Sequence, residues 1–168
     1  VSAKGKGQDL VVVDQDPGTT LESLDAGSVV LETVPLEKII DITLDDAHAP
    51  DSCEIFRKLT GLHRHRVGRI PFFFHFEDVF LFKPAIPPGI NINPENLPAD
   101  VVLPGTLAMT NDSRKGSGLV GVRITENSEF GPTSEPFEGT NIIGRVIDLE
   151  KLHKLKENEI AFIREVSP

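Results

Sequence analysis

Proline and glycine recur along the whole of this 168-residue chain and limit how long any regular element can be. The sequence contains 14 glycines and 13 prolines, and both residue types interrupt helices and strands. Where a regular pattern does occur, it alternates: Ile40, Ile42 and Leu44 share one face of a strand, and Asp41 and Thr43 share the other. The chain is therefore expected to be mainly β, with many short strands and about two short helices.

A phenylalanine-rich segment and two helix-like segments indicate where the strands and helices lie in the chain. Residues 72–82 hold six of the ten phenylalanines, a density at strand spacing that is typical of a core strand or a pair of strands. A helix is expected to begin at Asp51 or Ser52, either of which can cap it, and to end before Gly61. A second short helix is expected over 149–155. Short strands with few helices predict a closed barrel or a sandwich with helical caps.

The length of the chain fits one folded domain with a short flanking segment. Residues 1–9 are small, polar and glycine-rich, so we expect 1–35 to form an N-terminal arm or the end of a preceding domain, and 36–168 to form the folded domain. The first residue is Val1, and the missing initiator methionine indicates a fragment of a longer chain. A single cysteine, Cys53, excludes an intrachain disulfide, and no signal segment follows Val1, so a reducing, cytoplasmic compartment is expected.

The charge and hydropathy of the chain bear on its partners. A formal net charge of −9 argues against a general nucleic-acid binder, since contacts with phosphates require a positive field. No run approaches the roughly 20 apolar residues that span a bilayer. Proteins are therefore the expected partners, rather than nucleic acid or a membrane.

Four short motifs follow one another in a recognisable order. They are Ile40 to Gly61 (IDITLDDAHAPDSCEIFRKLTG), Gly105 to Asn111 (GTLAMTN), Gly116-Ser117 before an apolar strand, and Phe137-Glu138-Gly139 before Ile142 to Val146 (IIGRV). In order and wording these motifs resemble the cyclophilins, and the similarity is collinear from about Leu36 to Val166. The resemblance implies a cyclophilin-like closed β-barrel over 36–168.

Two stretches are closer to one particular group of proteins. Residues 59–83, with Leu-Thr-Gly, Val-Gly-Arg and Leu-Phe-Lys-Pro, and residues 129–146 (EFGPTSEPFEGTNIIGRV) resemble the methanogenesis marker protein 3 family of methanogenic archaea. That family carries a cyclophilin-like domain within a longer chain. The resemblance implies a component of the machinery that assembles or activates methyl-coenzyme M reductase, with the reductase or its activation factors as protein partners.

The cyclophilin resemblance also locates the groove that binds a proline substrate. Its Phe-His-Arg motif falls on Phe74-His75-Phe76, so a phenylalanine stands where the catalytic arginine is expected. The histidine that follows Asp-Gly falls on Asn141, and Asn111 alone keeps its family identity. The candidate groove residues are therefore Phe74, Phe76, Asn111 and Asn141.

Two further positions depart from the family pattern. The glutamine of the Ser-Gln-Phe-Phe run falls on Gly118, and the phenylalanine of the proline pocket falls near Val120. Prolyl isomerisation must lower a barrier of about 18–20 kcal/mol, and losing one preorganised donor typically costs about 100- to 1000-fold in rate. We therefore expect a non-catalytic, protein-binding module with no catalytic residue.

Two alternatives stay open. The first is an enzyme, a peptidyl-prolyl isomerase whose guanidinium is supplied from a displaced position such as Arg69 or Arg123. The second is a barrel that binds a small anion through Arg64, Arg66 and Arg69, since arginine suits bidentate contacts with anions.

Arg64, Arg66 and Arg69, with His63 and His65, form the only basic patch that the sequence shows. This basic loop is a candidate for docking an acidic partner, and the alternative is a solvated loop. Residues 129–138 are the other candidate, because Phe130 and Phe137 stand in a proline-stiffened loop that would lose little entropy on binding. Alternatively, both rings cap the barrel core.

Two histidines invite a metal-site interpretation. His63 and His65 alternate, so in a strand they would face the same side, and His48 or Asp46 could supply a third ligand. The neighbouring arginines disfavour a metal cation, so no metal is expected.

Two other features have unremarkable explanations. Cys53 lies on the apolar stripe of the expected helix, where a thiol behaves as a small hydrophobe. Residues 114–118 (RKGSG) lack the spacing of a phosphate-binding P-loop and are interpreted as a turn. No cofactor is expected.

Overall fold

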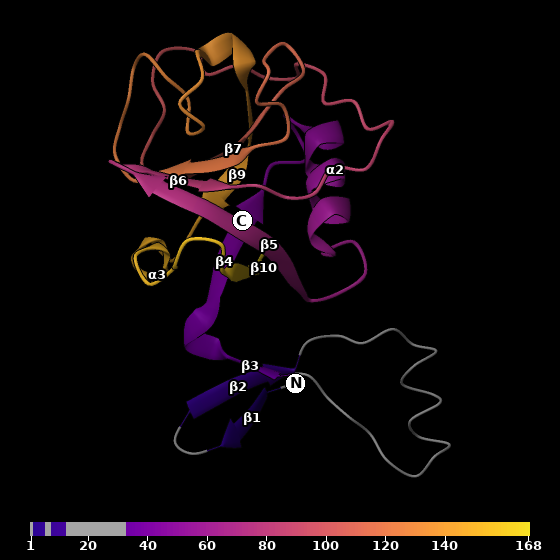
Figure 1. Cartoon of the computed structure of the whole chain (residues 1–168), viewed down its shortest axis with the longest axis vertical. Coiled ribbons are helices and arrows are strands. Elements are labelled where there is room, and N and C mark those ends of the chain that lie inside the picture. The colour runs from indigo at the N-terminus through magenta and orange to yellow at the C-terminus, as the bar shows by residue number, and fades with distance from the viewer. Residues whose placement is uncertain (1, 6–7, 13–32) are drawn as a thin grey trace.

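The computed structural model describes residues 2–5, 8–12 and 33–168, and its main body is a closed β-barrel (Figure 1). The strands are β1 (Ser2–Gly5), β2 (Gln8–Val12), β3 (Thr33–Pro35), β4 (Ile39–Leu44), β5 (Val67–Phe76), β6 (Val79–Phe82), β7 (Thr106–Thr110), β8 (Val120–Arg123), β9 (Thr140–Val146) and β10 (Ile160–Glu165). The helical elements are η1 (Leu36–Lys38), α2 (Pro50–Thr60), η2 (Phe137–Gly139) and α3 (Leu149–Leu152). The expected mainly β barrel with two short α-helices is confirmed, although α3 is shorter than predicted.

Seven strands close the barrel in the order β10-β4-β9-β7-β8-β6-β5. The C-terminal strand β10 completes it, because β10 pairs in parallel with β4 on one side and antiparallel with β5 on the other. The alternation predicted for β4 is confirmed, since Ile40, Ile42 and Leu44 all lie in the main hydrophobic core. Full closure leaves the barrel without an open edge strand.

The phenylalanine-rich run over 72–82 forms the β5–β6 hairpin. Phe72, Phe80 and Phe82 point into the barrel, where the ring centroid of Phe72 lies 5.3 Å from that of Phe82 and 6.1 Å from that of Phe80. Phe76, in contrast, is 56% exposed. The run is therefore a pair of strands, and only part of its aromatic surface contributes to the core.

The N-terminus of α2 differs from the prediction. Its N-cap is Ala49, which has no side-chain oxygen, and neither Asp51 nor Ser52 caps the helix. The backbone N–H groups of Asp51 and Ser52 instead donate to the carboxylate of Glu95, over 2.8 Å and 3.0 Å. The sequence prediction was wrong because the capping group comes from a distant loop. The predicted C-cap, Gly61, is confirmed by its left-handed φ of 87°.

A small antiparallel sheet, β1-β2-β3, precedes the barrel (Figure 1). Of the segment predicted to be an arm or the end of a domain, 1–35, residues 1, 6–7 and 13–32 lie outside the described part of the chain. Val34 of β3 is buried in a small cluster with Ile39 and Val67, which are barrel residues. This cluster connects the small sheet to the base of the barrel.

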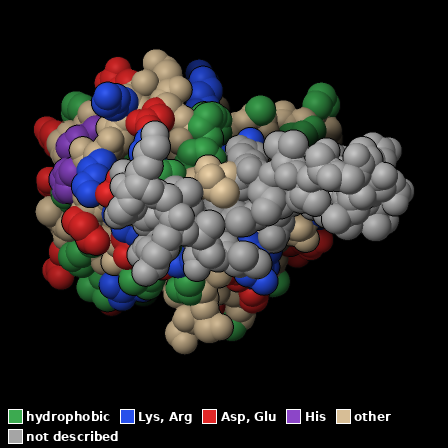
Figure 2. Space-filling view, turned by 90° about the horizontal axis from the view of Figure 1, so that it is seen from below, with side chains coloured by type: hydrophobic (Ala, Val, Ile, Leu, Met, Phe, Trp, Pro, Cys, Tyr) green, Lys and Arg blue, Asp and Glu red, His purple; other side chains and the backbone are tan. Residues whose placement is uncertain are grey.

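The surface of the molecule carries charges of both signs. Figure 2 shows acidic, basic and hydrophobic side chains interspersed over the face that is not covered by grey atoms. In the described part of the chain, no helix has both the length and the apolarity needed to cross a bilayer.

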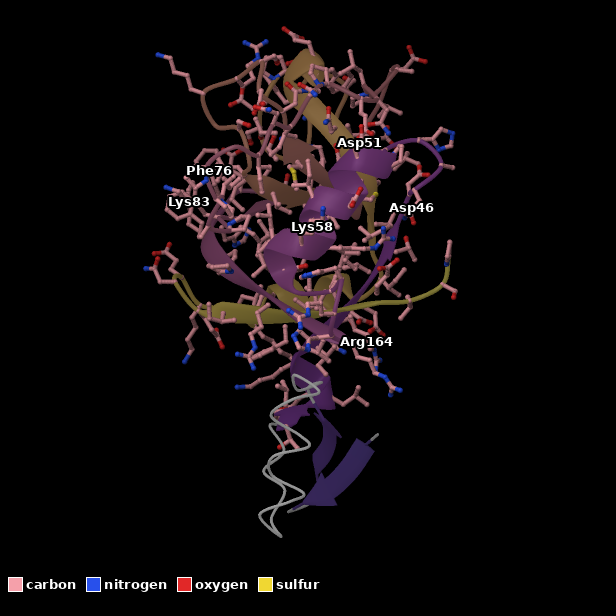
Figure 3. The ribbon with its side chains drawn as sticks, turned by 90° about the vertical axis from the view of Figure 1, so that its right-hand side faces the viewer. Asp46, Asp51, Lys58, Phe76, Lys83 and Arg164 are labelled. Carbon is pink, nitrogen blue, oxygen red and sulfur yellow. The ribbon has the colours of Figure 1, made fainter. Side chains whose placement is uncertain are left out.

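An ionic cluster joins three elements on one side of the barrel. The guanidinium of Arg57, on α2, donates two hydrogen bonds to Asp46, both of 2.7 Å, and two to Glu165 of β10, of 2.9 and 2.8 Å. These bonds raise the pKa of Arg57, with Glu165 as the larger cause, and the bond from Arg57 lowers the pKa of Asp46. Figure 3 shows Asp46 on the same side of α2 as Arg164, the neighbour of Glu165 in β10. The cluster therefore ties the helix to the closing strand.

We expect Arg57→Ala to lower the free energy of unfolding by about 2 kcal/mol, because hydrogen bonds to charged groups contribute more than neutral ones. The measurement is urea denaturation at neutral pH. Lys58→Ala is the matched control, since Lys58 is exposed and forms an ion pair with exposed Glu54, and it should change stability by less than about 0.5 kcal/mol. Equal effects of the two substitutions would contradict the role of the cluster.

Candidate functional site

Asn111 and Asn141, predicted from the sequence to belong to one groove, lie in contact. The Asn111 amide Nδ2 donates to the Asn141 Oδ1 over 3.0 Å, and both residues are fully buried. The Asn141 Nδ2 donates in turn to the Ser52 Oγ over 3.0 Å and to the backbone oxygen of Asn93 over 2.8 Å. The pair thus joins β7, β9, α2 and the loop between β6 and β7, and it faces protein atoms rather than solvent.

The proline-rich loop over 84–104 is fastened to the barrel by further polar contacts. The Asn96 side chain imitates a strand partner, since it accepts from the backbone N–H of Ile142 and donates to the Ile142 oxygen, over 2.8 and 3.0 Å. Asp112 accepts from the backbone N–H of Ile92 over 2.9 Å, and its own N–H donates to the Ile92 oxygen over 2.8 Å. These bonds hold the loop against β9 and the segment that follows β7.

Gly118, at the position of the family's glutamine, lies against this loop. Its φ is +92°, and a Cβ atom added there would lie 1.9 Å from the Cδ1 of Ile86. The Ile86 side chain therefore fills the space that a side chain at position 118 would take. Val120, at the position of the family's pocket phenylalanine, is buried in the barrel core. The chain's own residues thus pack at both of these positions.

Phe76 lies away from the two asparagines. Along the sheet, Phe76 pairs with Val79, which pairs with Arg123, whereas Asn141 pairs with Met109. Met109 pairs with Val120, three residues before Arg123 in β8, so the two rows are separated by about 10 Å along the strands. Phe74, half-buried in the same strand as Phe76, makes an edge contact with Phe73 at 4.7 Å. The structure thus brings Asn111 and Asn141 together but leaves Phe76 at a separate place.

The basic loop after α2 is divided between different neighbours. The Arg69 guanidinium lies 5.7 Å from the ring centroid of Phe162, on the outside of the barrel. His65 and Arg66 instead line an open cleft of about 740 Å³, together with Arg164. Arg64 is exposed, and like Arg66 and Arg69 it has interaction partners. The structure therefore places Arg69 and Arg66 against different neighbours.

The walls of this cleft carry charges that are largely paired. Asp45, Asp46 and Glu165 contribute carboxylates, of which the last two bond to Arg57. Arg164 donates to the Asp41 carboxylate over 2.8 and 3.2 Å, which raises the pKa of Arg164. With three carboxylates against Arg66 and Arg164 on its walls, the cleft does not present an excess of positive charge.

The candidate metal ligands are engaged elsewhere. The His48 Nδ1 lies 2.9 Å from an Asp45 carboxylate oxygen, Asp46 binds Arg57, and the His63 Nδ1 lies 3.2 Å from the Arg57 backbone oxygen. Within residues 33–168 and the described parts of β1 and β2, no group of three or more His, Cys, Asp or Glu side chains is placed to hold a metal ion.

Cys53 is fully buried, and its Sγ lies 3.4 Å from the backbone oxygen of Ile143. Burial is the main cause that raises the pKa of the Cys53 thiol to about 12, so the thiolate is scarcely populated at neutral pH. The residue packs as a small hydrophobe.

The loop over 129–138 lies at the end of the barrel opposite the basic loop, among the orange segments at the top of Figure 1. Phe130 is 42% exposed, whereas Phe137 is half-buried at the start of η2. Arg114, from the turn predicted over 114–118, forms an ion pair with Glu138 and holds the loop against the barrel. Only Phe130 of the two aromatic candidates offers a large exposed ring.

Sequence reasoning missed the residues that shape this end of the barrel. Both Ile86 and Glu95 lie in the proline-rich loop over 84–104: Ile86 occupies the space beside Gly118, and Glu95 caps α2. A signal was available for Ile86, because the replacement of a glutamine by Gly118 leaves a space that some other side chain must fill. No local signal identifies Glu95 as a cap.

The seven-stranded barrel and the short helices together define a cyclophilin-like β-barrel domain. A protein-family model described as a putative peptidyl-prolyl cis-trans isomerase domain matches residues 40–166, and the chain belongs to this family.

Relatives come from methanogenic archaea and are named UPF0288 proteins. The chain is 41% identical over 162 residues to the one from Methanosarcina barkeri, covering 95% of this chain and 31% of that protein. Identity is 40% to the Methanopyrus kandleri protein, covering 93% of this chain and 32% of that protein. The chain is 41% identical to the Methanothermobacter thermautotrophicus protein, and the match covers 94% of this chain and 30% of that protein. The chain thus spans about a third of the length of these relatives.

One solved structure, that of a conserved protein of unknown function from a locus in Enterococcus faecalis, resembles the chain. The TM-score is 0.46 at 16% identity, and the match covers 76% of this chain and 30% of that one.

We expect Gly118→Ala to destabilise the chain by about 1–3 kcal/mol more than Gly89→Ala, as overpacking typically does. Both glycines have a similar φ, +92° and +89°, but a Cβ at Gly89 meets nothing within 4 Å. The difference between the two variants in urea denaturation therefore isolates the contact with Ile86. Adding Ile86→Ala should remove the excess cost of Gly118→Ala. Equal costs for the two alanine variants would show that Ile86 does not fill this space.

Proposed function

We propose that this chain is a non-catalytic, cyclophilin-like module that binds a protein partner within a longer methanogen protein. The observation that carries the proposal is the contact between Gly118 and Ile86, because Ile86 occupies the space of a side chain at the position where the resemblance places the glutamine of the cyclophilin groove. A module that keeps the fold and closes the groove has lost the geometry for isomerisation but retains a rigid surface.

The chemistry of the remaining groove positions supports the same conclusion. Phe76 replaces the arginine that would stabilise the twisted amide, and a phenylalanine ring donates no hydrogen bond. Asn111 and Asn141 keep polar side chains, but their amides are buried and bonded within the protein. A peptide in solution therefore has no preorganised donor at these positions.

We further propose that the partner is methyl-coenzyme M reductase or one of its activation factors, in the cytoplasm of a methanogen. The support is the resemblance to the methanogenesis marker protein 3 family, together with relatives in Methanosarcina, Methanopyrus and Methanothermobacter. The net charge of −9 favours a protein partner over nucleic acid.

A second candidate function, prolyl isomerisation, is favoured by the description of the family and by the place of Arg123. This arginine lies in the same cross-strand row as Phe76, with Val79 between them. Its guanidinium would then act from β8, two strands away from Phe76, as the displaced arginine of an isomerase.

We expect the chain to accelerate cis-trans isomerisation of a short Ala-Pro peptide at least about 100-fold less than an active cyclophilin, since the preorganised donor is missing. Exchange-based NMR or a protease-coupled assay measures the rate, and Arg123→Ala should leave it unchanged. A cyclophilin-like rate that Arg123→Ala abolishes would establish the isomerase in place of the non-catalytic module.

We expect a tagged form of the full-length methanogen protein to co-purify with subunits of methyl-coenzyme M reductase or its activation factors at moderate salt, identified by mass spectrometry. Arg64→Glu/Arg66→Glu tests the basic loop and Phe130→Ser tests the 129–138 loop, with Lys58→Ala as an exposed control. Recovery of the tagged protein without any of these proteins would reject the reductase assignment.

A further inference from the structure

Four large apolar side chains are exposed on the two long loops at one end of the barrel. Leu97 is 50%, Val101 37%, Leu103 49% and Phe130 42% exposed. We call these residues the loop-end surface. Apolar groups that gather on neighbouring segments are typical of interaction sites, whereas singly scattered ones need no explanation.

Backbone pairing explains why the loop-end surface faces outward. Val102 and Asn127 form an isolated antiparallel bridge, with N···O distances of 2.8 and 3.0 Å, and Val102 is buried. Because neighbouring residues in an extended segment alternate, Val101 and Leu103 turn away from the core. The Asn127 side chain also accepts from the Phe130 N–H over 2.7 Å, which brings the Phe130 backbone to the same bridge.

Val101 and Leu103 form one wall of an open cleft of about 400 Å³. Thr43, Ile142 and Gly144, from β4 and β9, contribute to the lining. The cleft is therefore mostly apolar and rests on two barrel strands, so its base is preorganised.

The charges around the loop-end surface are almost all negative. Residues 94–104 and 126–138 contain six carboxylates and no lysine or arginine: Glu95, Asp100, Glu126, Glu129, Glu135 and Glu138. Glu95 caps α2 and the last two pair with Arg114, which leaves Asp100, Glu126 and Glu129 exposed around the apolar residues. Arg145, which lines the cleft, donates to the backbone oxygen of Pro104 over 3.2 Å.

We propose that the loop-end surface binds a cationic, amphipathic segment of a protein partner, with leucine-like side chains in the Val101–Leu103 cleft and lysine or arginine against Asp100, Glu126 and Glu129. This inference rests on the proposed function and names the surface and the partner's chemistry. The carboxylate rim opposes phosphates and anionic lipid, so the charge complementarity selects a basic protein segment.

The test is an NMR titration of the isotope-labelled 168-residue chain with three peptides of equal length. One carries two leucines flanked by lysines, one has glutamates in place of the lysines, and one has serines in place of the leucines. We expect only the leucine–lysine peptide to bind, with shift changes concentrated in 97–104 and 126–130 and an affinity that falls as salt rises.

Two variants separate the apolar and the ionic contributions. Val101→Ser/Leu103→Ser should weaken binding about tenfold or more, as the loss of buried apolar anchors does. Glu126→Gln/Glu129→Gln should weaken it about threefold at low salt and reduce its salt dependence. All four positions are exposed, so the urea midpoints should match that of the unaltered chain. Equal affinity for the glutamate peptide, unchanged binding by Val101→Ser/Leu103→Ser, or shifts elsewhere would overturn the inference.

The same Val101→Ser/Leu103→Ser substitutions, made in the full-length protein, distinguish a failure of the loop-end inference from a failure of the proposed function. If the variant loses both the co-purified partner and the binding of the peptide, the result supports the loop-end surface as the binding site. Retention of that partner, with no peptide binding, overturns the loop-end inference and leaves the binding module intact. Isomerase activity without any partner overturns the proposed function itself.

Discussion

Closure of the barrel by β10 is the constraint on which the rest of the structure depends. The strand must fit between β4 and β5, parallel to one and antiparallel to the other, so the C-terminal residues complete a sheet begun far earlier in the chain. Arg57 adds an ionic connection from α2 to Glu165 at the end of that strand. With every barrel strand paired on both sides, the loops can be long without leaving exposed strand edges.

The loop over 84–104 is held to the barrel and to α2 by hydrogen bonds. It satisfies groups on two elements: the Glu95 carboxylate caps α2, the Asn96 side chain pairs with Ile142 of β9, and the backbone oxygen of Asn93 accepts from the buried Asn141, also in β9. These bonds hold Ile86 against Gly118. Buried polar groups are costly unless they are hydrogen-bonded, so the network both fixes the loop and removes the asparagines from solvent.

Two surfaces are available for binding, and their clefts adjoin. Residues of β10 line the cleft beside the basic loop, residues of β4 and β9 line the cleft of the loop-end surface, and Leu44, Asp45 and Pro168 line both. The first cleft is mixed in charge with most groups paired, and the loop-end surface is apolar with an acidic rim.

The sequence by itself determined the local elements of this protein: the alternation of Ile40, Ile42 and Leu44, the C-cap at Gly61 and the aromatic strands over 72–82. The period of the hydrophobic pattern and the residue types at turns depend only on residues close together in the chain, so they can be recognised without a structure. The resemblance to cyclophilins also placed Asn111 and Asn141 in one site. Only the tertiary structure decided that Glu95 caps α2, that Ile86 fills the space beside Gly118 and that Val101 and Leu103 face solvent. Each of these outcomes depends on contacts between segments distant in the chain, whose geometry no local pattern encodes.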